Sequence, residues 1–263
     1  MRKKLSVALL SSIFLLSGNV LMAQAPEHVT EKKAAHTAVP HWGYEGAAGV
    51  EKWGTLSPEF KTCQTGKNQS PIDIKGAVDA NLPAINFKYN MLSASDIVNN
   101  GHTVQVNMWS GGEITLDGEK FKLKEFHFHT PSENTINGKN FPLEAQFVHV
   151  NSKHQIAIVS VMFEPGDDDE LLSVLWKDMP LKAGEGHKLD TNALKSLEFE
   201  ADVKNYYRFN GSLTTPPCTE GIRWIVMKTP RHVSQKQVLT FQSALLAPNN
   251  RPVQALNARI VVE

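Results

Sequence analysis

Two histidines separated by one residue, His127 and His129, could together bind a metal ion. In a β-strand, alternate side chains point to the same face, so both imidazoles would project to one side, whereas on a helix they would diverge. Phe126 and Phe128 would then enter the core. Glu125 shares the histidine face, where its carboxylate could accept the Nδ1–H of an imidazole and leave Nε2 for a metal. Taken alone, the pair fits either a metal site or a polar network.

A second polar face lies on residues 143–149, LEAQFVH. Strand alternation puts Glu144, Gln146 and Val148 on one face, and unpaired polar groups there would be costly to bury. We expect the carbonyl oxygen of Gln146 to bind a metal while its amide donates to Glu144. The alternative is a Gln–Glu hydrogen bond without a metal. His149 is the better ligand by atom type, but it points away unless a β-bulge intervenes.

The elements that must position these groups are mainly strands, separated by Gly-containing turns. Strand patterns occupy residues 84–90, 94–109, 112–129, 143–151, 155–165 and 222–230, and turn signals stand at 100–101, 111–112, 117–118 and 137–138. Helical patterns occur at 167–179, which opens with acidic residues, and at 234–246, which opens with a serine cap. No linker or repeat divides the chain. The sequence therefore predicts a mainly β, single-domain protein with a few surface helices.

The N-terminus has the pattern of a secretory signal peptide. A basic MRKK start precedes an apolar run at 5–18 and a small-x-small cleavage site, Ala23-Gln24-Ala25. We therefore predict a signal peptide at 1–25 and a flexible leader at 26–40, with the mature protein periplasmic or secreted. The apolar run is short for a membrane span, so we expect no membrane association after cleavage; an uncleaved anchor is the alternative.

The charge balance gives no electrostatic case for nucleic-acid binding. The chain has 27 basic and 27 acidic residues, and loss of Arg2, Lys3 and Lys4 with the signal leaves 24 against 27, a net charge of −3. Export would also place the only two cysteines, Cys63 and Cys218, in an oxidising compartment. We expect a disulfide between them; two buried free thiols are the alternative.

Several segments, in order, resemble the α-class carbonic anhydrases, especially the secreted bacterial branch, where Cys63 and Cys218 match a disulfide. The matching segments are HWGYEG (41–46), NQSPIDI (68–74), VNNGHTVQV (98–106), FHFHTPSEN (126–134), LEAQFVHVN (143–151), GSLTTPPCTEGIRWIV (211–226) and NNRPVQALNAR (249–259). The resemblance implies a carbonic anhydrase-like domain over 41–263, with a central twisted, mostly antiparallel sheet and a zinc ion at the bottom of a cleft. It also implies reversible hydration of CO2 to bicarbonate by zinc-bound hydroxide, and allows a homodimer.

The metal position departs from the family pattern. Three histidines bind zinc in the family; two match His127 and His129, but the third position falls on Gln146. Glu144 matches the carboxylate that orients the third ligand, and Glu125 stands where the family usually has a glutamine that orients the first histidine. The resemblance therefore implies a His-His-Gln zinc site with one altered supporting residue.

The remaining machinery matches the family. Thr214 matches the threonine that takes the proton of the hydroxide, Glu133 the acid that orients this threonine, and His102 the histidine that carries protons to solvent. The polar residues that organise the cleft water match Tyr44, Asn100 and Gln105. The apolar wall on which CO2 rests matches Val148, Ile158, Leu213, Ile222 and Trp224, and Thr215 lines the same cleft.

The glutamine leaves two functions open. A neutral amide oxygen leaves zinc its full charge, as imidazole does, so the cost should fall on zinc affinity rather than on Lewis acidity. The Glu125 carboxylate could offset part of that cost by adding negative charge near the cation. We favour a zinc-dependent carbonic anhydrase with a His-His-Gln site. The alternative is a metal-free, carbonic-anhydrase-related binding protein without catalysis.

Overall fold

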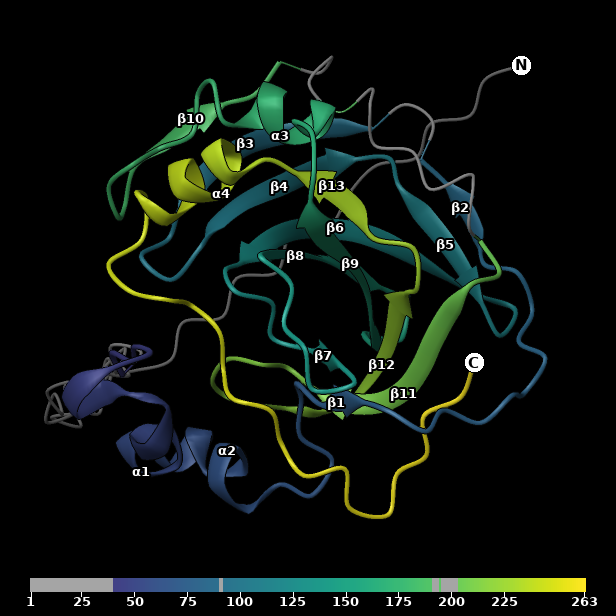
Figure 1. The fold of residues 1–263 in the computed structure, drawn as a ribbon. Coiled ribbons are helices and arrows are strands. Elements are labelled where there is room, and N and C mark those ends of the chain that lie inside the picture. The colour runs from purple at the N-terminus through teal and green to yellow at the C-terminus, as the bar shows by residue number, and fades with distance from the viewer. Residues whose placement is uncertain (1–39, 90–91, 191–193, 195–202) are drawn as a thin grey trace, which may run out of the picture. The chain divides into compact units, whose positions relative to one another are not determined.

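Most of the strand patterns assemble into one mixed sheet of eleven strands (Figure 1). The computed structural model describes residues 40–89, 92–190, 194 and 203–263, and the residues from Pro40 onward form one unit. The predicted signal peptide at 1–25 and residues 26–39 of the predicted leader lie outside the described residues. The fold confirms the prediction of a mainly β, single-domain protein.

The long path through the sheet has the strand order β10-β3-β4-β6-β8-β9-β12-β11, with β5 beside β6, β2 beside β5 and β13 beside β9. Neighbours are antiparallel except β12 and β13, which run parallel to β9. The strands of this sheet are β2 (Asn86–Lys88), β3 (Ser93–Asn99), β4 (Val104–Ser110), β5 (Glu113–Leu116), β6 (Glu119–His129), β8 (Leu143–Val150), β9 (Ile156–Pro165), β10 (Gly186–Lys188), β11 (Tyr206–Ser212), β12 (Glu220–Met227) and β13 (Arg231–Val233). A separate parallel pair joins β1 (Asp73–Ile74) to β7 (Thr135–Ile136).

The helices are short, and two of them lie within the helical segments predicted at 167–179 and 234–246. The α-helices are α1 (Trp53–Leu56), α2 (Thr62–Thr65), α3 (Glu170–Leu175) and α4 (Gln235–Gln242), and 3₁₀ turns occupy Gly46–Ala48, Val50–Lys52 and Pro58–Phe60. The Asp169 carboxylate caps α3, and Ser234 opens α4 with a capping box. Among the described residues, no helix is long and apolar enough to span a membrane.

A β-bulge in β6 decides which residues face the cavity. Phe121 and Leu123 belong to the larger core, but the register shifts between Leu123 and Glu125, and the even-numbered Phe126 and Phe128 then take the core side. A bulge inserts one residue and so reverses the alternation beyond it. The odd-numbered side chains from Glu125 onward are thereby released from the core. Both phenylalanines are fully buried, which confirms the predicted parity of the His-x-His segment.

Cross-strand register then gathers the polar side chains into rows. His127 on β6 lies opposite Gln105 on β4 and Gln146 on β8. Two residues away along β6, Glu125 lies opposite Val148, and Val148 lies opposite Ile158 on β9. Side chains that are directly opposite in a sheet share a face, so residues distant in sequence become neighbours there.

Candidate active site

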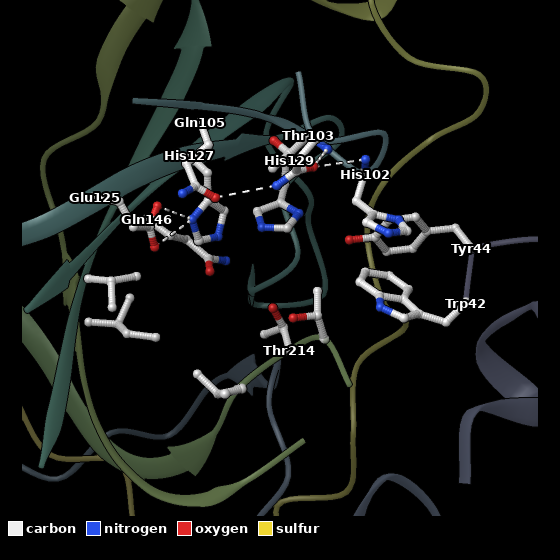
Figure 2. Close-up of a pocket in the computed structure, with 15 residues that line it drawn as sticks. Trp42, Tyr44, His102, Thr103, Gln105, Glu125, His127, His129, Gln146 and Thr214 are labelled. Carbon is white, nitrogen blue, oxygen red and sulfur yellow. Dashed lines mark hydrogen bonds and ion pairs between the residues drawn. The ribbon is translucent and has the colours of Figure 1, made fainter. Parts of the chain in front are cut away.

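The two rows form one side of a cavity of about 200 Å³ (Figure 2). Thirteen of its fifteen lining residues are ones that the sequence predicted: Tyr44, Asn100, His102, Gln105, Glu125, His127, His129, Gln146, Val148, Ile158, Leu213, Thr214 and Thr215. The other two, Trp42 and Thr103, were not predicted. Figure 2 shows His127, His129 and Gln146 close together, with Thr214 across the cavity from them. The structure therefore brings the candidate ligands and the candidate threonine to one place.

Both imidazoles are held through Nδ1. His127 donates from Nδ1 to the Glu125 carboxylate, with oxygen distances of 2.9 and 3.2 Å. His129 donates from Nδ1 to the backbone carbonyl of Asn249 at 2.6 Å. Carboxylate and carbonyl oxygens only accept, so the proton of each neutral ring must sit on Nδ1 and each Nε2 keeps a free lone pair. The rings stand 5.1 Å apart at 76°.

The Nε2 of His129 is a buried polar atom without a hydrogen-bond partner among the described residues. Its nearest charged neighbour is the Glu133 carboxylate at 3.4 Å. Buried polar atoms normally find partners, and an orphan calls for an explanation such as a bound ion. A metal bound to this nitrogen would supply the missing partner.

Gln146 contacts a different acid from the one predicted. Its side-chain amide donates to Glu133 at 2.9 Å, whereas the sequence prediction was a bond to Glu144. The reason is that Glu144 is already saturated. It accepts from the backbone N–H groups of Glu133 and Asn134, from the Asn134 side-chain amide and from the Ser160 hydroxyl. Glu144 therefore fixes the turn at 133–134, and the Gln146 amide turns to Glu133.

Burial controls the electrostatics of the two inner carboxylates. Burial raises the pKa of Glu133, although hydrogen bonds from Arg251, Thr214 and Gln146 act in the opposite direction. Burial also raises the pKa of Glu144, and the neighbouring charge of Glu133 raises it further. Deprotonating either carboxylate is therefore costly unless positive charge lies nearby.

The two histidines respond to burial differently. Burial alone would lower the pKa of His127, but the carboxylates of Glu125, Glu133 and Glu144 together outweigh it, so the pKa is raised. Burial and the charge of His127 lower the pKa of His129 to about 4. His129 is consequently neutral at physiological pH, which is the form that binds metals.

These residues fit a divalent metal ion. In each of the two imidazoles, a hydrogen bond holds Nδ1 and leaves Nε2 for a metal. Gln146 lies at the strand position directly opposite His127. In the described part of the chain, three carboxylates, Glu125, Glu133 and Glu144, surround these groups, and the guanidinium of Arg251 lies near Glu133. When ionised, this set carries two excess negative charges, which a dication would balance. Among the described residues, no three His, Cys, Asp or Glu side chains are grouped so that they alone could hold a metal ion.

Thr214 is positioned by Glu133, as predicted. The threonine side chain is nearly buried and hydrogen-bonds to the Glu133 carboxylate. The backbone N–H of Arg251 donates to Oε1 of Glu133 at 2.9 Å. Because ionised Glu133 only accepts, the Thr214 hydroxyl must donate to it and can accept only from the cavity side.

His102 lines the cavity and is stacked on Trp42. The two rings are parallel within 5° and their centroids are 3.7 Å apart. Burial lowers the pKa of His102, and the positive charge of His41 lowers it further. The side-chain oxygen Oδ1 of Asn100 accepts from the His102 backbone N–H, which fixes the loop that carries the ring. Trp42 belongs to the HWGYEG segment (41–46), so its place in that segment could have marked it as a cavity residue.

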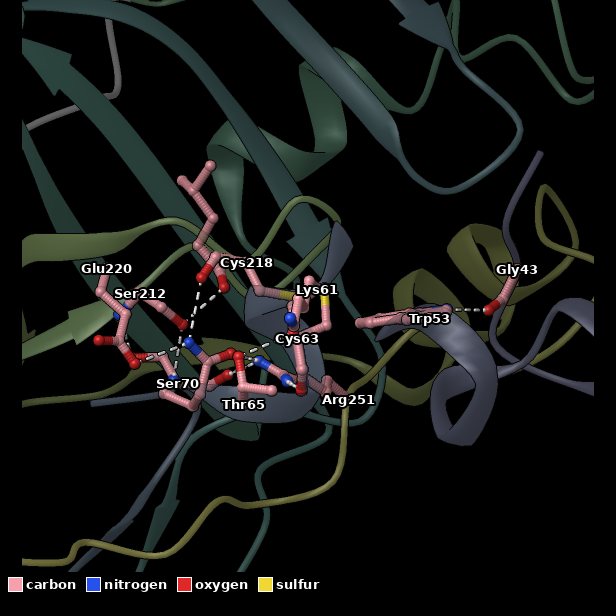
Figure 3. Close-up of a disulfide and its surroundings, with 12 residues drawn as sticks. Gly43, Trp53, Lys61, Cys63, Thr65, Ser70, Ser212, Cys218, Glu220 and Arg251 are labelled. Atoms are coloured by element: carbon pink, nitrogen blue, oxygen red, sulfur yellow. Dashed lines mark hydrogen bonds between the residues drawn. A yellow bond between two sulfur atoms is a disulfide. The ribbon is translucent and has the colours of Figure 1, made fainter. Parts of the chain in front are cut away.

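Sequence reasoning missed the positioning role of the segment 249–251. The Asn249 side chain donates to the backbone carbonyl of His102, while its own carbonyl holds His129. Two residues later, Arg251 holds Glu133 through its backbone and sends its guanidinium to the backbone carbonyls of Ser70 and Cys63 (Figure 3). The segment NNRPVQALNAR (249–259) resembles the family, but its sequence does not show which residues it contacts.

The predicted disulfide is present. Cys63 and Cys218 are bonded, 155 residues apart in the sequence, and the described residues contain no free cysteine (Figure 3). Cys218 follows Thr214 and Thr215 closely, and its backbone N–H donates to the carbonyl of Thr215 at 2.9 Å. The disulfide therefore ties the loop that carries both threonines to α2.

The apolar wall divides into two layers. Val148, Ile158 and Leu213 line the cavity. Ile222 and Trp224 are buried behind them in the smaller core cluster and are not among the lining residues of the described cavity. Their predicted contact with a substrate stays a prediction, and the structure places them as support for the wall.

Comparisons with known proteins point to one family. The family model for eukaryotic-type carbonic anhydrases matches residues 48–263. A carbonic anhydrase of Neisseria gonorrhoeae is 49% identical over 231 residues, covering 88% of this chain and 90% of its own, and one of Pectobacterium carotovorum is 40% identical over the full length of both. The solved α-carbonic anhydrase of Thermovibrio ammonificans, in complex with sulfanilamide, superposes with a TM-score of 0.81 at 45% identity, covering 86% of this chain and all of that one.

Proposed function

Because the chain belongs to the α-class carbonic anhydrase family, we propose that it catalyses the reversible hydration of CO2 to bicarbonate with a zinc ion held by His127, His129 and Gln146. The observation that carries this proposal is the buried Nε2 of His129, which has no hydrogen-bond partner in the described part of the chain and lies in a cavity lined also by His127 and Gln146. Zinc, when bound, supplies the Lewis acidity that lets water ionise near neutral pH, as is established for zinc hydrolases and hydratases.

The chain's own residues orient the reactants. The Thr214 hydroxyl donates a hydrogen bond to Glu133, so its oxygen is left to accept a hydrogen bond from a hydroxyl group in the cavity. That group is thereby held with its lone pairs free for attack. Val148, Ile158 and Leu213 offer an apolar surface to CO2, which carries no charge and makes weak hydrogen bonds.

His102 is suited to take the released proton to solvent. Its ring lines the same cavity, and its lowered pKa keeps it neutral, and thus able to accept, into mildly acidic solution. Asn100 and Gln105 hydrogen-bond to each other at 3.3 Å beside it and offer polar groups to the intervening water.

We expect the enzyme to act outside the cytoplasm. The expected signal sequence motivates this, and the Cys63–Cys218 disulfide supports it, because disulfides persist in oxidising compartments.

The function is tested by stopped-flow CO2 hydration on purified, zinc-supplemented protein. We expect turnover that is lost with a strong chelator and restored by zinc. Thr214→Ala should lower kcat/KM by about a hundredfold while zinc stays bound, because the orienting acceptor is removed. Absence of hydration in fully zinc-loaded protein would contradict the proposal and favour a non-catalytic binding protein.

A further inference from the structure

Glu125 differs from the other acids near the candidate metal ligands because it faces the cavity itself. It is the one carboxylate among the described residues that line the cavity, and its side chain is 18% exposed. Glu133 and Glu144 are buried behind the surface and are satisfied by three or more donors each. A charge on Glu125 therefore acts directly on whatever occupies the cavity.

The charge of Glu125 is only weakly compensated by the protein. Both of its oxygens are directed at the single Nδ1–H of His127, at 3.2 and 2.9 Å. Among the described residues, no lysine or arginine forms an ion pair with it, although ten ion pairs exist elsewhere. A half-enclosed carboxylate without a cationic partner keeps most of its field, since screening by protein and solvent is incomplete there.

Orienting His127 does not require this charge. A glutamine at 125 would present an amide oxygen to the same Nδ1–H and hold the ring equally well. The charge adds two effects that glutamine lacks: attraction for a cation on His127 and repulsion of anions entering the cavity. The first matters here because the neutral amide oxygen of Gln146 is a weaker zinc donor than an imidazole nitrogen.

Resting on the proposed function, we propose that Glu125 sets the charge of the cavity: it strengthens the retention of zinc by the His127–His129–Gln146 site and weakens the binding of anions, including the bicarbonate product. CO2 is uncharged and is not affected. Glu125 is thus a positioning residue with an electrostatic role, acting through His127 and through space.

The test compares Glu125→Gln with wild type by two equilibrium measurements. Zinc affinity is measured by competition with a chelator, and thiocyanate affinity by calorimetry on zinc-saturated protein. We expect zinc affinity to fall by about 10- to 100-fold, the usual range for changing a group that supports a metal ligand. Thiocyanate affinity should rise by about three- to tenfold, the range of a partly screened charge interaction.

Two further variants separate charge from contact. Glu125→Asp keeps the charge but shortens the reach to His127, so thiocyanate affinity should stay within about twofold of wild type even if zinc binding weakens. Glu164→Gln removes the carboxylate of another His–Glu pair, with His232, which is exposed and outside the cavity lining, and should change neither affinity. Melting of the metal-free proteins checks that each variant is folded.

The inference requires that Glu125→Gln lower the affinity for zinc and raise the affinity for thiocyanate. Weaker binding of both zinc and thiocyanate in Glu125→Gln would show that Glu125 only orients His127, and unchanged binding of both would show that it does neither; either result overturns the inference while leaving the metal site intact. Failure of wild type and Gln146→His alike to bind zinc would overturn the metal site and this inference together.

Discussion

The side-chain amide of Gln146 donates a hydrogen bond of 2.9 Å to the carboxylate of Glu133, the same carboxylate that accepts from Thr214. One buried acid therefore joins a candidate metal ligand to the residue that orients the attacking group. Amide nitrogen facing a carboxylate also fixes the direction of the glutamine, because the reversed amide would place two acceptors together. Its oxygen is thereby left for other contacts, including a metal.

Gln146 variants should change zinc affinity in opposite directions. Gln146→Ala removes the proposed oxygen ligand of the metal and the N–H group that hydrogen-bonds to Glu133. It should weaken zinc binding by at least about tenfold. Gln146→His restores an imidazole and should tighten zinc binding, because nitrogen is the better donor for zinc. Competition with a fluorescent chelator measures both. Equal affinity for wild type and Gln146→Ala would show that the amide is not a ligand.

Glu144 should matter for stability more than for the metal. Glu144→Gln replaces an acceptor of four hydrogen bonds with a group that carries its own N–H donors, and two of the four partners are backbone N–H groups that cannot become acceptors. We expect the free energy of unfolding of the metal-free protein to fall by about 2–3 kcal/mol in urea titrations. Zinc affinity should change less than in Gln146→Ala. A larger effect on zinc than on unfolding would mean that Glu144 acts on the ligand after all.

The acid limb of turnover should report His102. Its pKa is lowered by burial and by His41, so the midpoint of the acid limb of turnover should lie below pH 6.5. His41→Ala removes a neighbouring positive charge, raises the pKa of His102 and should move the limb to higher pH. His102→Ala should lower turnover by about a hundredfold in dilute buffer, with recovery in imidazole buffer. A limb unmoved by His41→Ala, or turnover indifferent to imidazole, would remove His102 from the proton path.

His149 should make the protein less stable in mild acid. It is fully buried, its Nδ1 donates to the Phe147 carbonyl, and its Nε2 accepts from the Tyr89 hydroxyl. Burial lowers its pKa from 6.5 to about 4. The unfolded chain therefore binds a proton at higher pH than the folded one, so this contribution is complete above pH 6.5 and is lost as pH falls toward 4.

The size of that loss is about 3 kcal/mol for a shift of this extent. Urea titrations between pH 7 and 4 measure it, and His149→Gln serves as the comparison because it cannot take up the proton. We expect the pH slope to be shallower in the variant, even though its stability at pH 7 is lower. Identical slopes would assign the acid sensitivity to other groups.

Strand parity predicted much of the site from the sequence. The alternation of His127, His129 and their phenylalanine neighbours is a local property, and the structure confirms it. The same reasoning correctly turned His149 away from the cavity, where it pairs with Tyr89. The bulge before Glu125 was not predicted, because an extra residue in one strand is defined only by the register of its partner.

Long-range partners were the part that the sequence could not supply. The choice of Glu133 over Glu144 by Gln146 depends on how many donors already surround Glu144, and those come from the turn at 133–134 and from β9. Asn249 likewise reaches His129 and His102 across more than a hundred residues. Local patterns carry no information on such contacts, since they arise only when separate elements pack.

The most direct measurement is an anomalous difference map at the zinc absorption edge from crystals grown with ample zinc. The account predicts a single strong peak in the cavity, within bonding distance of Nε2 of His127, Nε2 of His129 and the side-chain oxygen of Gln146. A cavity floor without any peak, or a peak bound to the two histidines with Gln146 turned away, would contradict it.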